Sequence, residues 1–106
     1  MKSPFVVVLT TINSKKEADR LATLFVKSKL AACVSVVPGV TSYYSWKKKF
    51  CRDRELLLIM KTKKECLSRL EKALVKNHPY ETPEMVVLPI QSGLKKYLAW
   101  INDSLL

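Results

Sequence analysis

The chain has 106 residues, of which 48% are apolar, and its 19 lysines and arginines outnumber nine acidic residues to give a formal net charge of +10. This length and composition predict one domain, residues 1–106, with a substantial hydrophobic core, and two glycines and five prolines are too few for a disordered chain. No apolar run approaches the roughly 20 residues of a membrane span, so we expect no membrane partner.

The first half of the chain predicts a strand, a helix and a longer strand. The apolar run Phe5–Leu9 is typical of a short buried strand. Ser14 and Glu17 have the spacing of a capping box, in which the serine accepts from the Glu17 amide and the Glu17 side chain reaches back. The helix that follows has one apolar face: Ala18, Leu21, Ala22, Phe25 and Val26. An extended region then runs from Ala31 to about Trp46, and Pro38-Gly39 predicts a bulge within it.

The second half predicts a hairpin partner, a helix, a strand and a last helix. Lys47-Lys48-Lys49 provides a polar turn that leads to the strand Glu55–Lys61. A second capping box, from Thr62 to Glu65, opens a helix that Pro79 stops. The apolar face of this helix is Cys66, Leu67, Leu70, Ala73 and Leu74. Met85–Ile90 is typical of another short strand, and an amphipathic helix follows Gly93. The apolar residues of the last helix are Leu94, Tyr97, Leu98, Ile101 and Leu105.

The predicted order β-α-β-β-α-β, followed by a helix, is that of an α+β ferredoxin-like sandwich with an antiparallel four-stranded sheet. The strands are apolar on both sides, since Leu57 and Ile59 alternate with Leu56, Leu58 and Met60. Two helices cover only one face of such a sheet, so the C-terminal helix or another chain must cover the second face. We therefore expect an oligomer.

Nucleophilic catalysis is not predicted, and we expect no enzymatic activity. A cysteine nucleophile needs a base, and His78 is the only histidine. Cys33 and Cys66 lie in apolar segments expected in the core, and no glycine-rich phosphate loop, HExxH or CxxC motif occurs. Together with Cys51 the chain has three cysteines, an odd number. The apolar run near the N-terminus is too short for a signal peptide. Both features favour a reducing, cytoplasmic location.

RNA binding is one alternative function, because RNA-recognition modules share this order of elements and the chain is basic. Such modules stack bases on aromatic residues of the central strands, whereas Glu55–Lys61 is aliphatic and leaves only Tyr44 and Trp46 for this role. A solvated lysine-rich surface explains the charge more simply. Nucleic acid is therefore not the expected partner.

Binding of a metal or a small ligand is the other alternative, and the segment Lys76–Glu84, KNHPYETPE, points to it. Pro79 ends a helix and Pro83 favours an extended conformation at Thr82, but neither role explains the acidic and aromatic residues beside them. We predict a ligand cleft in an oligomer, to which this segment contributes His78 as the titrating residue. The predicted lining is Tyr44, Trp46, Lys61, His78, Tyr80, Glu81 and Glu84. The imidazole is also a candidate ligand for Cu(II) or another divalent cation, the alternative being a hydrogen-bonding or capping residue.

Several separate motifs resemble the signature of the CutA divalent-cation tolerance family, and the resemblance extends from Val6 to the C-terminus. These motifs are Leu30-Ala31-Ala32-Cys33-Val34, Pro38-Gly39-Val40, Ser42, Tyr44, Trp46, Lys61-Thr62, His78-Pro79-Tyr80-Glu81, Pro83-Glu84, Leu88-Pro89-Ile90, Gly93, Tyr97 and Trp100-Ile101.

The resemblance implies a ferredoxin-like subunit of a homotrimer similar in plan to the PII signalling proteins. In that plan, strands of neighbouring subunits extend each other's sheets, and clefts between subunits gather the residues predicted above together with Glu55. The resemblance also implies a link to tolerance of copper and other divalent cations, and no enzymatic reaction. In some members copper ligation involves a cysteine at the end of the first strand and a His-His pair, where this chain has Thr10 and Asn77-His78. Only His78 is retained as a metal ligand of that set.

Overall fold

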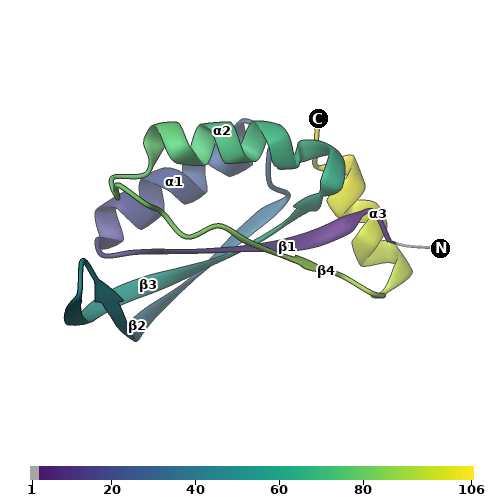
Figure 1. Cartoon of the computed structure of the whole chain (residues 1–106). Helices are drawn as coiled ribbons and strands as arrows, with labels where there is room; N and C mark the ends of the chain where they lie inside the picture. The colour runs from purple at the N-terminus through teal and green to yellow at the C-terminus, as the bar shows by residue number, and fades with distance from the viewer. Residues whose placement is uncertain (1–2) are drawn as a thin grey trace.

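The computed structural model describes residues 3–106, which form a four-stranded antiparallel sheet with two helices on one face (Figure 1). The elements are β1 (Phe5–Ile12), α1 (Lys15–Lys27), β2 (Cys33–Trp46), β3 (Lys49–Lys63), a 3₁₀ turn η1 (Lys64–Cys66), α2 (Leu67–Asn77), β4 (Val86–Pro89) and α3 (Lys95–Asp103). The strand order β2-β3-β1-β4 confirms the predicted α+β, ferredoxin-like fold with an additional C-terminal helix. No helix in residues 3–106 is long and apolar enough to cross a membrane.

The hydrophobic core lies between the sheet and the helices α1 and α2. Alternate residues of β1 are buried, among them Val8 and Ile12, and they pack with Phe25 of α1 and Leu70 of α2. Burying each such side chain stabilises the fold by about 1.5–3 kcal/mol. The helical face predicted for α1 packs on the sheet through Ala18, Leu21 and Phe25. Val26 was also predicted on this face but is 40% exposed.

The opposite face of the sheet is only partly covered. The register of β1 against β3 and β4 places Val7, Leu9, Leu57, Ile59, Val86 and Leu88 on this side. We call this side the open face. At one end Phe5 of β1 and Leu98 of α3 pack against the same buried cluster, which includes Ile101, but Val86 and Leu88 remain 44% and 46% exposed. The prediction that both sheet faces are apolar is thus confirmed, and within residues 3–106 one chain covers the open face only at the α3 end.

The β2–β3 hairpin is longer than the sequence indicated, since β3 begins at Lys49 and not at Glu55. Its distal part pairs polar and aromatic residues that carry no apolar alternation, so the pattern did not reveal it. Lys47 and Lys48 form the two-residue turn with φ of 50° and 66°, the left-handed geometry that suits a tight hairpin. The predicted bulge is confirmed by a register shift between Val37 and Val40.

One of the two predicted capping boxes is wrong and the other is half right. The Thr62 hydroxyl caps no helix: it donates to the Leu30 carbonyl at 2.7 Å, and the chain enters α2 through the 3₁₀ turn. Ser14 does cap α1, accepting from the Glu17 amide at 3.3 Å. The Glu17 carboxylate, however, binds Arg20 at 2.9 Å, and this hydrogen bond lowers the Glu17 pKa.

The last two elements follow the prediction with small differences. Strand β4 starts one residue later and ends one residue earlier than Met85–Ile90, and it pairs antiparallel with β1 at the edge of the sheet. In α3, Ile101 is buried as expected. Leu94 was predicted on the apolar face but is the N-cap residue that precedes the helix, and it is exposed.

Replacing Thr10 by valine is expected to stabilise the protein. The Thr10 side chain is fully buried on the helix-facing side of β1, and its hydroxyl has no hydrogen-bond partner among the described residues. Removing an unsatisfied buried hydroxyl should raise the free energy of unfolding by about 1 kcal/mol, measured by urea denaturation. Thr62→Val is the matched control: Thr62 is equally buried but hydrogen-bonded, so its replacement should lower stability. Equal destabilisation by both substitutions would contradict this interpretation.

Candidate functional site

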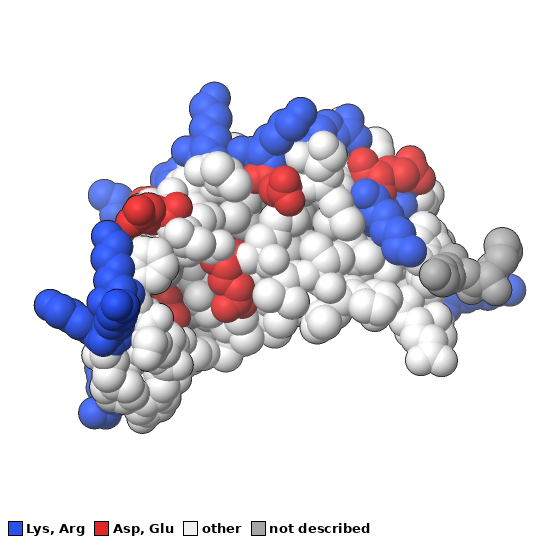
Figure 2. Space-filling view, viewed as in Figure 1, with Lys and Arg blue, Asp and Glu red and all other residues white. Residues whose placement is uncertain are grey.

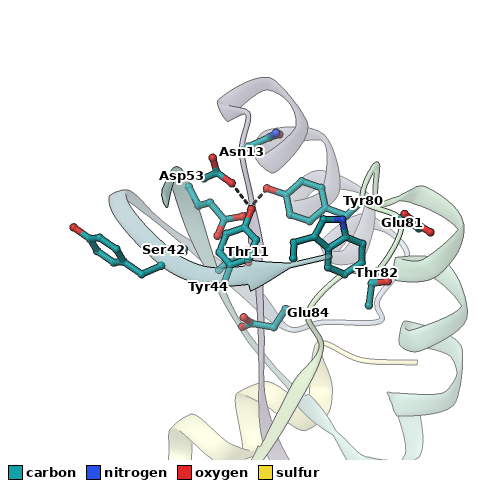
Figure 3. A pocket seen from close by; sticks show the side chains of 12 residues that line it. Thr11, Asn13, Ser42, Tyr44, Asp53, Tyr80, Glu81, Thr82 and Glu84 are labelled. Carbon is teal, nitrogen blue, oxygen red and sulfur yellow. Dashed lines mark hydrogen bonds between the residues drawn. The ribbon is translucent and has the colours of Figure 1, made fainter. Parts of the chain in front are cut away.

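A cavity of about 610 Å³ opens where the β2–β3 hairpin, the end of β1 and the segment before β4 meet (Figure 3). Its lining residues are Thr11, Asn13, Ser42, Tyr43, Tyr44, Trp46, Asp53, Glu55, Tyr80, Glu81, Thr82 and Glu84. Most of the lining residues that belong to strands lie on the open face. Residues paired across neighbouring strands share a face, and Ser42 pairs with Asp53 and Thr11 with Leu57. The alternation that buries Leu58 beneath the helices therefore turns Asp53 and Glu55 towards the cavity.

Two phenol–carboxylate hydrogen bonds organise the cavity wall. The Tyr44 hydroxyl donates to Asp53, and the Tyr80 hydroxyl donates to Glu55 at 2.5 Å (Figure 3). The hydrogen bond to Asp53 raises the pKa of Tyr44 to about 12. Burial, together with the bond to Glu55, raises the pKa of Tyr80 as well. Both phenols therefore stay protonated at neutral pH and act as hydrogen-bond donors.

His78 does not line the cavity but lies behind it, where it holds Tyr80 in place. It is buried, its Nε2 lies 2.8 Å from the Thr11 carbonyl oxygen, and its Nδ1 accepts from the Tyr80 amide at 3.1 Å. Because a carbonyl can only accept and an amide can only donate, these two contacts place the ring proton on Nε2. The imidazole also packs edge-on against the Tyr80 ring, with centroids 4.6 Å apart. Both ring nitrogens of His78 thus have a hydrogen-bond partner.

The cavity is acidic although the molecule is strongly basic. Asp53, Glu55, Glu81 and Glu84, four of the nine acidic residues in the chain, line it. None of the described residues that line it is lysine or arginine. Figure 2 shows the basic side chains instead over the helical layer and at the hairpin tip. At the rim, Lys47 lies 3.9 Å from Glu81, but both side chains are more than two-thirds exposed, so the pair contributes little to stability.

The structure brings most of the predicted cleft residues together in a single chain. Six of them line the cavity: Tyr44, Trp46, Glu55, Tyr80, Glu81 and Glu84. Lys61 is elsewhere: its Nζ donates to Cys33 Sγ at 3.4 Å, next to the Tyr97 hydroxyl at the α3 end of the sheet. Lys61 follows Glu55 by six residues on β3, which is about 20 Å along a strand. Only a neighbouring copy could bring its own Lys61 to this cavity.

Sequence reasoning missed the second carboxylate of the wall. Asp53 is two residues before Glu55, and residues at this spacing share a face of a strand. The missed signal was the hairpin length, because β3 was predicted to begin only at Glu55. Thr11 and Asn13 were also missed, since β1 was predicted to end at Leu9 and not at Ile12.

The described part of one chain does not assemble a compact metal site. No three His, Cys, Asp or Glu side chains in residues 3–106 come close enough together to hold a metal ion. Thr10 faces the core, the Asn77 side chain donates to the Ala73 carbonyl at 2.7 Å, and both His78 nitrogens are hydrogen-bonded. These three positions therefore do not fit a copper centre as they stand, and ligation by His78 would require breaking its present hydrogen bonds.

Comparison with known proteins gives a consistent result. The family model of the "CutA1 divalent ion tolerance protein" matches residues 6–104. The chain is 44% identical over 101 residues to "Protein CutA 1, chloroplastic" of Oryza sativa subsp. japonica, covering 95% of this chain and 57% of the rice protein. It is 42% identical over 98 residues to the "Divalent-cation tolerance protein CutA" of Thermus thermophilus, covering 92% of this chain and 95% of that protein.

The solved structures agree with the sequence matches. The crystal structure of CutA1 from Oryza sativa superposes with a TM-score of 0.94 at 42% identity, covering 98% of this chain and 95% of that one. The chain thus spans little more than half the length of the full rice protein but nearly all of its crystallised part and of the Thermus protein.

Alkaline titration should reveal the two phenol–carboxylate bonds. Ultraviolet absorbance of tyrosinate should show a late-ionising fraction that shrinks in Tyr44→Phe and in Tyr80→Phe, because the pKa values of both phenols are raised. A raised folded-state pKa means that the stabilisation is complete below the unfolded pKa of about 10 and is lost as the pH rises through the folded value, about 12 for Tyr44. If each variant instead loses a phenol that titrates near the ordinary value of about 10, the two bonds do not exist in solution.

Proposed function

This chain belongs to the CutA1 divalent ion tolerance protein family, and we propose that it takes part in the response to divalent cations. In this proposal the protein is a homotrimer that binds a positively charged ligand in the cavity and catalyses no reaction. One observation supports the ligand most directly: a molecule of net charge +10 gathers four carboxylates, without a basic residue among those described, in one concave site. A negative, partly desolvated cleft concentrates cations.

The open face supports assembly into an oligomer. Its exposed Val86 and Leu88, together with Val37 at 39% exposure, form an apolar surface on the sheet. Such surfaces are typical of protein–protein interfaces. That the oligomer has three subunits, arranged as in the PII signalling proteins, is inferred from the family resemblance. In that arrangement the cavity, at the edge of the open face, becomes a cleft between subunits.

Copper or another divalent cation is the first candidate ligand. Since residues 3–106 of one chain present no preformed set of three donors, a tightly held metal would need donors from more than one copy. The carboxylates of Asp53, Glu55 and Glu84 are the residues that we assign to cation attraction. His78 is assigned to positioning Tyr80. A cytoplasmic location remains part of the proposal, resting on the odd number of cysteines, although the rice relative is named as chloroplastic.

A small-molecule sensor is the second candidate, favoured by the size of the cavity. A volume of about 610 Å³ is in the range of sites for organic ligands and far exceeds that of an ion. Single-stranded RNA is disfavoured by the same geometry. Tyr44, one of the two residues that could stack bases, is bonded to Asp53, and the surrounding carboxylates repel phosphates.

Calorimetric titration of Cu(II) into the reduced protein tests the proposed role. Light scattering should first give a mass three times the 12.1 kDa of one chain. We expect saturable binding that weakens about tenfold in the double variant Asp53→Asn with Glu84→Gln, because the two charges that attract the cation are removed. His78→Gln, which keeps a donor and an acceptor, should retain the wild-type affinity.

The double variant Glu65→Gln with Glu71→Gln removes the same charge from exposed positions in and just before α2 and should bind like the wild type. Binding that is lost in His78→Gln but kept in the cavity variant would make the histidine the ligand. A monomer by light scattering would remove the basis for an intersubunit cleft.

A further inference from the structure

We propose that the ligand of this cavity is an organic cation with two or more ammonium groups, a di- or polyamine. The inference rests on the proposed function, since it names the chemical class of the positively charged ligand. Charge distribution, aromatic walls and the separation of the carboxylates lead to it independently.

Glu55 is a buried carboxylate that has no basic partner among residues 3–106 of its own chain. Its side chain lines the cavity at only 8% exposure. It accepts one hydrogen bond, from the Tyr80 hydroxyl to Oε2, and no lysine, arginine or histidine among the described residues forms an ion pair with it. A buried carboxylate normally has a charged or multiply hydrogen-bonded partner, and one phenol leaves most of its acceptor capacity unused. A ligand ammonium group would complete this partner set.

Aromatic rings form a second part of the wall. Trp46, Tyr44 and Tyr80 line the cavity together with the acidic side chains, and Trp46 remains 41% exposed. The indole already attracts a cation, as Lys47 Nζ lies 5.8 Å from its ring centroid. Aromatic faces bind alkylammonium groups through cation–π attraction and bury the adjoining methylenes. Aromatic and acidic residues in one cavity therefore match a ligand that is both aliphatic and cationic.

The carboxylates are arranged for several separated charges and not for one ion. Within residues 3–106 no three acidic, histidine or cysteine side chains converge on a point, and Asp53 and Glu55 each give one oxygen to a phenol. Figure 3 shows Glu84 and Glu81 apart from Asp53, on the segment that leads to β4. A flexible chain with ammonium groups several bonds apart can reach such separated carboxylates, whereas a metal ion needs its donors in one shell.

Spermidine, titrated into the assembled protein at neutral pH and followed by calorimetry and by the Trp46 indole NMR signal, tests the inference. We expect saturable binding that weakens at least about tenfold in Glu55→Gln and about fivefold in Trp46→Leu. The matched controls Glu71→Gln, on the exposed side of α2, and Trp100→Leu, which stacks on Tyr97 in α3, should bind within about twofold of the wild type. Glu84→Gln gives a second readout should Glu55→Gln fail to assemble.

The outcomes separate the inference from the proposed function. Spermidine binding that is absent, or equally weak in the cavity and control variants, overturns the polyamine assignment. If Cu(II) still binds in a manner that depends on Asp53 and Glu84, the proposed cation site stands and only the ligand class is wrong. If neither cation binds, and a basic side chain of a neighbouring copy is found against Glu55, both proposals fall together.

Discussion

The alternation of side chains along β3 is the constraint on which this molecule depends. One set of residues, including Leu58 and Met60, is buried beneath α1 and α2 and forms the core. The other set, which includes Asp53, Glu55 and Leu57, lies on the open face. A shift by one residue would move Asp53 and Glu55 to the helix-facing side and Leu58 and Met60 to the open face. Folding and the character of the open face are therefore determined by the same strand, and the cavity is a direct consequence of its register.

The histidine illustrates how a chemically suggestive residue can be structural. His78 ends α2, connects the Thr11 carbonyl to the Tyr80 amide, and so fixes the phenol that bonds to Glu55. Pro79 ends the helix and Pro83 favours an extended chain before β4. His78, at the end of the helix, orients the cavity wall. A chain with one histidine can in this way preserve the geometry of a cleft without using the imidazole as a ligand.

Much of the fold was predictable because its signals are local. Apolar periodicity located α1, α2, α3 and the apolar parts of β1 to β4, but not the 3₁₀ turn η1, and Pro38-Gly39 marked the bulge. The parts that were missed depend on contacts between distant residues. Thr62 has the spacing of a cap but bonds to Leu30 across the core, and Asp53 lies on a polar extension of the hairpin that only cross-strand pairing stabilises. For the cleft, the residue types were informative, but the separation of Lys61 from Glu55 required counting along the strand. The role of His78 required the three-dimensional structure.

The view that a basic protein maintains a negative, cation-accepting cavity can be tested most directly with crystals of the assembled protein soaked in rubidium bromide. Anomalous scattering locates both ions in one experiment. We expect rubidium in the cavity beside Asp53, Glu55 and Glu84, and bromide along the lysine-rich helical layer. Bromide in the cavity, or a neighbouring subunit's basic side chain in place of rubidium, would contradict a cation site.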